Sequence, residues 1–230
     1  MCGRFALHSS EQTLQAVFGV QLPQDLAPRF NIPPTDPILG IRVADGIRRA
    51  SRWRWGLVPQ SIATKRGLRG KPLINARSES ASTRTLFKYA LRYRRVLIPA
   101  DGFFEWRKTD RGKQPLHFQV GNEPFAMGGL YEHATLADGS PIDSATILTT
   151  EANALVSTVH HRMPVIIPRD DWDLWLDPKT DEGGIAHLLA PYPPQAMTMR
   201  EVSERVNHVR HDDPGCIGPP EPPADQLRLF

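Results

Sequence analysis

The second residue of the 230-residue chain is a cysteine, which lies between the initiator methionine and Gly3. An initiator methionine is normally removed before a small residue, and its removal would leave Cys2 with a free α-amine beside its thiol. Reference pKa values of about 7.7–8.0 for the amine and about 8.5 for the thiol predict that both are partly nucleophilic near neutral pH. The thiolate could attack an acyl carbon with the amine as base, or the amine could form an imine with an aldehyde that the thiol closes to a thiazolidine. Cys2 could also be an ordinary small residue.

Two further residues could assist such a nucleophile. The side-chain amide of Asn75 could orient a substrate oxygen or the terminal amine, or it could cap the segment that follows. Glu105 lies between Phe104 and Trp106 on a predicted strand, so its carboxyl group points away from both rings. In a polar pocket, partial burial would raise the pKa of Glu105 and suit it to acid–base catalysis. On an exposed face, Glu105 would instead pair with the basic residues just after it.

Two adjacent histidines, His160 and His161, join a predicted helical segment to a predicted strand. One imidazole could exchange a proton with a reacting oxygen near pH 7. Neighbouring side chains usually point in different directions, so at most one histidine is expected in catalysis, and both could be ordinary loop residues. No group of residues has the spacing of a metal site, so the sequence predicts neither a metal nor a cofactor.

The formal net charge of +3 conceals an asymmetry between the two halves of the chain. Residues 1–120 carry 21 Lys+Arg and 8 Asp+Glu, a net +13, whereas residues 121–230 carry 7 and 17, a net −10. Within the basic half, the alternation of arginine and tryptophan at 52–55 predicts a strand with its tryptophans in the core. The asymmetry favours a polyanion bound in a basic groove, although the two halves could also pair their charges within the fold.

Many short elements must position these residues. Helices are expected over 10–18, capped by Ser9 or Ser10, and over 83–92, with shorter helical segments at 152–159, 169–176 and 183–190. The apolar face of the helix over 83–92 is expected to consist of Leu86, Tyr89, Ala90 and Tyr93. Strands are expected at 38–43, 51–58, 95–99, 102–107, 115–120, 124–131, 145–150, 163–167 and 196–202, and a surface loop at 60–73. This order predicts a single α+β domain with a bent, mostly antiparallel, barrel-like sheet flanked by short helices.

The domain is expected to span 1–211, followed by a mobile, proline-rich tail over 212–230. No stretch approaches the ~20 apolar residues that a bilayer span needs, and the N-terminus lacks the pattern of a secretory signal. The two cysteines, Cys2 and Cys216, are far apart and form neither a disulfide framework nor a zinc site. The sequence therefore predicts a cytoplasmic protein, associated with the nucleoid if its partner is DNA.

Six short motifs occur in order along the chain. They are Met-Cys-Gly-Arg-Phe at 1–5, Arg-Phe-Asn-Ile-Pro-Pro at 29–34, Arg-Trp-Gly-Leu-Val-Pro at 54–59, Ile-Asn-Ala-Arg-Ser-Glu at 74–79, Pro-Ala-Asp-Gly-Phe-Phe-Glu-Trp at 99–106 and His-His-Arg-Met-Pro at 160–164. This set resembles the SRAP family, the SOS response-associated peptidases or abasic-site processing proteins. The resemblance runs from residue 2 to about residue 210.

The resemblance implies a domain that binds abasic sites in single-stranded DNA, where Cys2 captures the open-chain sugar aldehyde as a thiazolidine DNA–protein crosslink. It implies that Asn75 is the active-site asparagine, Glu105 the acid–base carboxylate and His160 the catalytic histidine. The residues implied to contact DNA are Arg4, Arg77 and Arg162 at phosphates and Pro34 near the displaced bases. It also implies removal of Met1 by autoproteolysis or an aminopeptidase, and it makes a strand-cleaving AP-lyase reaction feasible. One departure is His161, because the family often has an acidic residue there.

Two other functions stay open, and the C-terminus adds a partner. An N-terminal-cysteine amidohydrolase is one alternative, because some glutamine amidotransferases also begin Met-Cys-Gly, although such an enzyme needs no basic groove. A non-covalent single-stranded DNA binding module is the other. The last five residues resemble the pentapeptide that binds the bacterial sliding clamp, with anchors Gln226, Leu227, Leu229 and Phe230. The same residues could instead fold back onto the domain.

Overall fold

The structure, a computed structural model, describes residues 2–66, 71–110 and 112–221. The strands in these ranges are β1 (Phe5–Leu7), β2 (Arg29–Ile32), β3 (Pro37–Ala44), β4 (Ile47–Trp55), β5 (Asn75–Arg77), β6 (Arg95–Ala100), β7 (Gly102–Thr109), β8 (Gly112–Val120), β9 (Phe125–Thr135), β10 (Pro141–Glu151), β11 (Arg162–Pro164), β12 (Ile166–Ile167) and β13 (Met197–Glu201). The α-helices are α1 (Glu11–Phe18), α2 (Gln60–Arg66), α3 (Ser78–Ala81), α4 (Thr85–Tyr93) and α5 (Trp172–Leu176). Short 3-10 helices are η1 (Val156–Thr158), η2 (Arg169–Asp171), η3 (Ala186–Leu189), η4 (Pro194–Ala196), η5 (Glu204–Asn207) and η6 (Pro214–Ile217). Within this part of the chain, every helix is too short or too polar to cross a membrane.

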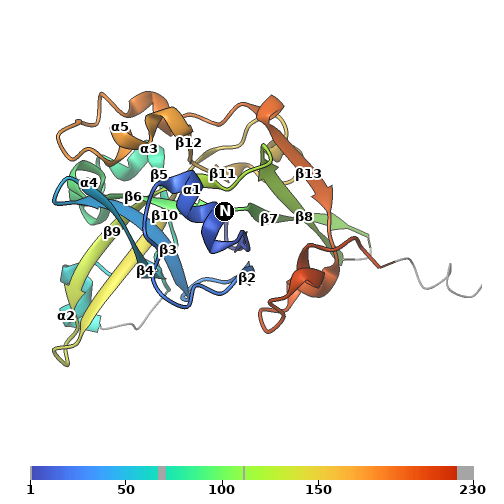
Figure 1. The fold of residues 1–230 in the computed structure, drawn as a ribbon, viewed down its shortest axis with the longest axis horizontal. Coiled ribbons are helices and arrows are strands. Elements are labelled where there is room, and N and C mark those ends of the chain that lie inside the picture. The colour runs from blue at the N-terminus through green and yellow to red at the C-terminus, as the bar shows by residue number, and fades with distance from the viewer. Residues whose placement is uncertain (1, 67–70, 111, 222–230) are drawn as a thin grey trace, which may run out of the picture.

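Five strands close into a barrel-like ring, which occupies the left half of the view in Figure 1. β10 pairs with β4, β4 with β3, β3 with β6, β6 with β9, and β9 pairs back with β10. β4 and the short strand β5 both run parallel to β10, whereas the other pairings in the ring are antiparallel. The sequence-based prediction of an α+β fold with a mostly antiparallel, barrel-like sheet is confirmed.

A second, open sheet lies on the right of Figure 1, in the order β13-β8-β7-β1-β2. Only Asp101 separates β7 from the barrel strand β6, so the two sheets are joined there directly. The Asp101 carboxylate accepts hydrogen bonds from the backbone N–H groups of His8 and Ser9 and from the Ser9 hydroxyl, at 2.5–2.7 Å. These bonds hold the end of β1 against the junction of the two sheets, so the residues just before β1 lie between them.

The barrel core follows the alternation seen in the sequence. On β4, Trp53 and Trp55 are 1% and 0% exposed, and the intervening Arg54 is only half-buried, so the tryptophans are core residues as predicted. A Cβ atom at Gly40 of β3 would lie 2.6 Å from a ring carbon of Trp53. Glycine is therefore required at this point for the indole to approach the neighbouring strand.

The two predicted helices are confirmed, but one of them buries a different face. Ser10 caps α1 by accepting from the Thr13 N–H. In α4 the buried residues are Phe87, Ala90 and Leu91, so the expected apolar face is wrong except at Ala90. The buried face is shifted by one position from the expected face, so Phe87 and Leu91 point into the core. The exposed residues of the expected face are Leu86, Tyr89 and Tyr93, and both tyrosine rings lie against arginine guanidinium groups.

Three further expectations differ from the structure. Residues 60–66 form α2, where a loop was expected, because Ala63 packs against Val58 and Ala134. The segments over 152–159 and 183–190 contain only the short 3-10 helices η1 and η3. The predicted mobile tail is wrong for residues 212–221, because Cys216 is fully buried and the Asp212 carboxylate accepts from two backbone N–H groups of β2. Residues 222–230 lie outside the described residues.

Candidate active site

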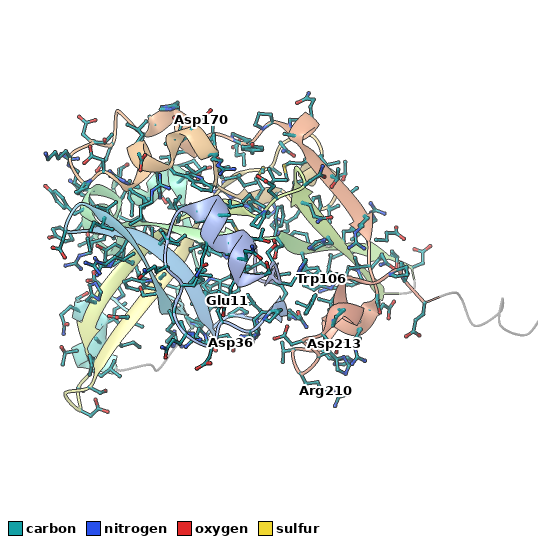
Figure 2. The ribbon with its side chains drawn as sticks, viewed as in Figure 1. Glu11, Asp36, Trp106, Asp170, Arg210 and Asp213 are labelled. Atoms are coloured by element: carbon teal, nitrogen blue, oxygen red, sulfur yellow. The ribbon has the colours of Figure 1, made fainter. Side chains whose placement is uncertain are left out.

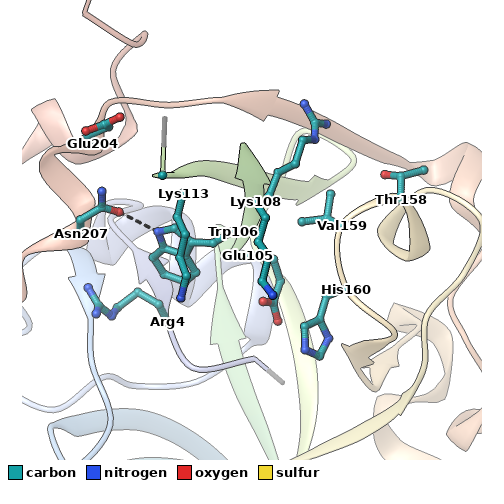
Figure 3. A pocket seen from close by; sticks show the side chains of 12 residues that line it. Arg4, Glu105, Trp106, Lys108, Lys113, Thr158, Val159, His160, Glu204 and Asn207 are labelled. Carbon is teal, nitrogen blue, oxygen red and sulfur yellow. Dashed lines mark hydrogen bonds between the residues drawn. The ribbon is translucent and has the colours of Figure 1, made fainter. Parts of the chain in front are cut away.

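A cavity of about 890 Å³ opens where β7, the residues just before β1, and the residues around η1 and η5 meet (Figure 3). Its lining combines basic, acidic and aromatic side chains: Arg4, Glu105, Trp106, Arg107, Lys108, Gly112, Lys113, Thr158, Val159, His160, Glu204 and Asn207. Three residues predicted from the sequence, Arg4, Glu105 and His160, therefore share one cavity although they come from three distant segments.

Cys2 lies directly before β1 and is fully buried. Its backbone carbonyl accepts a hydrogen bond of 2.8 Å from the Asn75 side-chain amide, and its thiol faces the Arg4 carbonyl at 4.0 Å. Burial, with a smaller contribution from the negative charge of Glu105, raises the pKa of the Cys2 thiol to about 12. This raised pKa applies to the chain that carries Met1, in which it favours the protonated thiol; the expectation for Cys2 as the free N-terminal residue stays a prediction.

Glu105 lies on β7 and is 6% exposed. Burial raises the pKa of its carboxyl group above the ordinary range for glutamate. The alternative of an exposed glutamate paired with the basic residues after it is wrong, because Arg107 bonds to Glu201 at 3.0 Å instead. The carboxyl group thus lies in the polar cavity, where it can hold or release a proton closer to neutral pH than an exposed glutamate would.

His160 follows η1 and faces the cavity from the side opposite Arg4 (Figure 3). Its Nδ1 atom accepts from the Arg162 backbone N–H at 3.0 Å, so a neutral ring carries its proton on Nε2. Burial lowers the pKa of His160, which favours this neutral form. The His161 ring stacks on His160 with centroids 4.4 Å apart but is itself exposed, and His160 is the one of the two that lines the cavity.

The barrel side supplies Asn75 and Arg77 from β5, which runs parallel to β10. The Asn75 amide nitrogen bonds to Cys2, while its buried Oδ1 atom has no hydrogen-bond partner among the described residues. That oxygen can accept from an incoming donor. Arg77 is exposed at the end of β5, and Pro34 is half-buried in the turn between β2 and β3. Neither residue lines the cavity, and among the described residues neither forms a hydrogen bond with Cys2.

Arg4 is held by neutral groups. Its Nη1 atom donates to the Asn31 side-chain oxygen at 2.6 Å and to the Val206 carbonyl at 2.9 Å. Its guanidinium carbon lies 5.7 Å from the centre of the Trp106 ring, close enough for a cation–π contact. Because these partners carry no charge, the guanidinium keeps its positive charge available to an anion in the cavity.

Arg162 is bound differently. It is 7% exposed, and its two Nη atoms donate to the two carboxylate oxygens of Glu79 at 2.6 and 2.9 Å. One of them also donates to the Thr149 carbonyl. The paired guanidinium lowers the pKa of the Glu79 carboxyl group, which favours its charged form. A phosphate at Arg162 would have to compete with this carboxylate.

Sequence reasoning missed three residues of the site, Asn31, Trp106 and Asn207. The Trp106 indole N–H donates to the Asn207 side-chain oxygen at 2.7 Å, as the dashed line in Figure 3 marks. Trp106 belongs to β7, and Figure 2 shows it near the segment that carries Arg210 and Asp213. Asn31 could have been found from the sequence, because it is a polar residue inside the motif at 29–34. Nothing in the sequence indicated that the region after residue 203 returns to the cavity.

These contacts define what the site can do. Glu105 and His160 can each exchange a proton, and both lie beside an N-terminal segment that carries a protonated thiol. Arg4 adds a positive charge whose hydrogen-bond partners, the Asn31 amide and the Val206 carbonyl, are neutral. In the ranges that the structure describes, no three His, Cys, Asp or Glu side chains gather to hold a metal ion. The arrangement suits addition of a nucleophile to a carbonyl carbon on an anionic substrate.

Comparison with known proteins identifies the family. The sequence model described as SOS response associated peptidase (SRAP) matches residues 1–209. The abasic site processing protein YoqW of Bacillus subtilis is 35% identical over 223 residues, which are 94% of this chain and 99% of that protein. The abasic site processing protein HMCES of Gallus gallus is 31% identical over 194 residues, which are 73% of this chain and 56% of that protein. The chain therefore belongs to the SRAP family.

Two further comparisons bear on the fold. The abasic site processing protein YedK of Escherichia coli is 25% identical over 229 residues, 95% of this chain and 100% of that protein. A solved structure from Bacteroides thetaiotaomicron superimposes with a TM-score of 0.84 at 22% identity, covering 95% of this chain and 99% of the other. At that identity the likeness concerns the fold alone. The shared fold extends over nearly the whole chain.

Proposed function

We propose that this protein captures abasic sites in single-stranded DNA as a covalent crosslink through Cys2, as part of a DNA damage response. The observation that carries the proposal is the position of Cys2, which Asn75 holds at the junction of two sheets beside Glu105. The names of the relatives, abasic site processing proteins, support the same substrate. DNA binding would associate the protein with the nucleoid.

The chemistry begins with removal of Met1, which exposes the α-amine of Cys2. The sugar at an abasic site is a cyclic hemiacetal, and in this proposal Glu105 and His160 move the proton that opens it to an aldehyde. The amine adds to the aldehyde carbon, and loss of one water gives an imine. The thiol then adds across the C=N bond, with sulfur joining carbon and the proton joining nitrogen. The raised pKa of the thiol is compatible with this last step, because the imine nitrogen takes the proton.

The DNA backbone would be held by the arginines implied by the family motifs. Arg4 and Arg77 supply the larger share, because Arg4 has neutral partners and Arg77 is exposed. Arg162 is a further phosphate contact in this proposal, and Pro34 lies near the displaced bases. The proposal also includes removal of Met1 by the protein's own peptidase activity or by an aminopeptidase. An AP-lyase reaction is feasible, because an imine at the sugar activates loss of the β-phosphate.

A denaturing gel tests the proposal. The protein is incubated with a single-stranded oligonucleotide that contains one abasic site, and mass spectrometry first verifies whether Met1 has been removed. We expect a shifted, denaturation-resistant band for the wild type and none for Cys2→Ala. Binding without any crosslink would overturn the proposal in favour of a non-covalent binding module. Glutaminase activity without a crosslink would overturn it in favour of an N-terminal-cysteine amidohydrolase.

The C-terminal pentapeptide supports a second partner, the replication sliding clamp. The anchors Gln226, Leu227, Leu229 and Phe230 lie outside the described residues, so this part of the proposal rests on the sequence pattern alone. Deleting residues 226–230 is expected to abolish binding to the purified clamp in a pull-down and to leave crosslinking unchanged. Clamp binding that survives the deletion would remove this partner from the proposal.

A further inference from the structure

Asn31, the third residue of β2, is a fully buried polar side chain. Its amide nitrogen donates towards three backbone carbonyls of one segment, those of Val206 at 3.2 Å, His208 at 3.1 Å and His211 at 2.6 Å. Its amide oxygen accepts from Arg4 Nη1 at 2.6 Å. This one amide therefore joins Arg4 to residues 204–213, called the wall segment below, in addition to the direct bond from Arg4 to the Val206 carbonyl.

The orientation of the Asn31 amide follows from its neighbours. Three carbonyl oxygens surround one end of the amide, and carbonyls accept but never donate, so this end must be the NH₂ group. The other end faces a guanidinium, which donates but never accepts, so it must be the oxygen. A rotated amide would set NH₂ against guanidinium and oxygen against carbonyls. The buried environment thus permits one arrangement, and that arrangement presents an acceptor to Arg4.

The wall segment is anchored to β2 a second time, by Asp212. Its carboxylate accepts from the backbone N–H groups of Phe30 at 2.5 Å and Asn31 at 2.9 Å, and it also bonds to Arg29 Nε. The wall segment in turn gives the Val206 carbonyl to Arg4 and the Asn207 side chain to Trp106. Arg4 and Trp106, which stack on each other in the cavity, are therefore both fixed from the same segment.

We propose that Asn31 is a positioning residue that aims the Arg4 guanidinium into the cavity for a DNA phosphate. This inference rests on the proposed function for its ligand. Its physical basis is that a half-buried guanidinium needs acceptors, and that Asn31 and Val206 satisfy one of its nitrogen atoms without neutralising its charge. The remaining donors are then available to an anion. A carboxylate in place of the Asn31 amide would hold the guanidinium equally well but would cancel the charge that attracts the phosphate.

Binding to a non-reactive ligand tests the inference. The probe is a single-stranded oligonucleotide carrying a tetrahydrofuran analogue of the abasic sugar, with its Kd measured over a series of salt concentrations. The variants are Arg4→Ala, Asn31→Ala, the double variant, and the nearly isosteric Asn31→Asp. Asn122→Ala, in the exposed turn between β8 and β9, is the matched asparagine control.

We expect Arg4→Ala to weaken binding roughly tenfold, as for a charge-assisted hydrogen bond. Loss of one phosphate contact is expected to reduce the slope of log K against log salt by about 0.7. Asn31→Ala is expected to reproduce both changes, and the double variant to add nothing further, because both residues serve one contact. Asn31→Asp is expected to weaken binding as well, although it keeps an oxygen beside Arg4. Asn31→Ala or Asn31→Asp binding with wild-type affinity and slope, or additive losses in the double variant, would overturn the inference.

A second measurement needs no DNA. The Nη signals of Arg4, assigned in the ¹⁵N spectrum by comparison with Arg4→Lys, are expected to show slow rotation in the wild type and faster rotation in Asn31→Ala, which removes the acceptor. Equal rotation in the two proteins would overturn the positioning role. If the wild type fails to bind or crosslink abasic DNA while Arg4 is immobilised by Asn31, the proposed function fails and the positioning role stands. Melting curves identify any variant that does not fold.

Discussion

On the side of the second sheet, Arg4 is held by the amide oxygen of Asn31 and the carbonyl of Val206, whereas on the barrel side Arg162 is bound by the carboxylate of Glu79. The two arginines belong to motifs of the same family and would have the same role by resemblance. The charge of their hydrogen-bond partners distinguishes them. A cation with neutral partners retains its attraction for a phosphate, while a cation in a two-bond ion pair has much of that attraction already satisfied.

The two sides also differ in an ionisable group, the buried His117 on the second sheet and the exposed Glu79 on the barrel side. On the second sheet, His117 of β8 is 1% exposed and lies against Phe104, and neither ring nitrogen has a hydrogen-bond partner among the described residues. Burial lowers the pKa of His117 to about 3, so the ring is neutral. On the barrel side, Glu79 is ionised and its pKa is lowered by Arg162. The His117 ring is neutral and the Glu79–Arg162 pair is charged, so acid should affect the two groups at different pH values.

The largest predicted effect concerns His117. A proton binds this histidine in the unfolded chain below about pH 6.5 but in the folded chain only near pH 3. Its contribution to stability is therefore complete above pH 6.5 and decreases as the pH falls from there towards 3, by about 5 kcal/mol at most. Urea unfolding at pH 7, 6, 5 and 4 measures this loss. His117→Leu should remove this part of the pH dependence.

The exposed His208 supplies the control for that experiment, because His208→Leu should leave the pH dependence of the wild type intact. If His117→Leu loses stability with pH as steeply as the wild type does, the contrast between a neutral side and a charged side is incorrect. At pH 7 the leucine variant is expected to fold, since it replaces a buried ring that has no hydrogen-bond partner among the described residues with an apolar side chain of similar size.

The second prediction compares Arg4→Leu with Arg162→Leu directly. Arg4→Leu should weaken binding of the tetrahydrofuran oligonucleotide roughly tenfold, because it removes a cation with neutral partners. Arg162→Leu should weaken it less than threefold, but should lower the free energy of unfolding by about 2 kcal/mol, because Glu79 and the Thr149 carbonyl lose their donor. Fluorescence anisotropy and urea unfolding measure the two quantities. Equal losses of affinity would show that the carboxylate does not reduce the role of Arg162.

The sequence predicted the elements of this contrast but not the contrast itself. The period-2 pattern at 52–55 predicted the buried tryptophans, and the capping serine predicted α1, because both signals are local. The catalytic candidates came from ordered motifs, and Glu105 and His160 indeed share a cavity. The buried face of α4 was predicted one position away from the observed one, because two neighbouring faces of this helix both carry apolar or aromatic side chains.

Long-range contacts account for what sequence reasoning missed. Asn31 and Val206 are 175 residues apart, and no local pattern joins β2 to a segment that is mostly charged and polar. Likewise, the pKa of Cys2 depends on burial by the whole fold, so a reference value could not predict it. The choice of Glu79 as the partner of Arg162 depends on the pairing of β11 and β5 with β10. Charge counting along the chain cannot distinguish a paired arginine from one with neutral partners.

The smallest predicted effect sharpens the comparison on the barrel side. Glu79→Gln removes the carboxylate but keeps an oxygen beside Arg162, so the guanidinium regains charge for a phosphate. Binding of the tetrahydrofuran oligonucleotide should strengthen about twofold to threefold at low salt, and this gain should vanish at high salt.

The cost in stability is about 1 kcal/mol or less, because the Glu79 side chain is 46% exposed and solvent screens the pair. The pKa of Glu79 is lowered by folding, so its contribution is present above the ordinary glutamate pKa and is lost as the pH falls through the lowered value. Wild type and Glu79→Gln should thus differ in urea unfolding at pH 7 and converge in acid. Glu123→Gln, which breaks the fully surface-exposed pair with Arg169, is the matched control and should change neither quantity measurably. If Glu79→Gln behaves like that control, Arg162 is not restrained by its carboxylate, and its difference from Arg4 must lie in its burial.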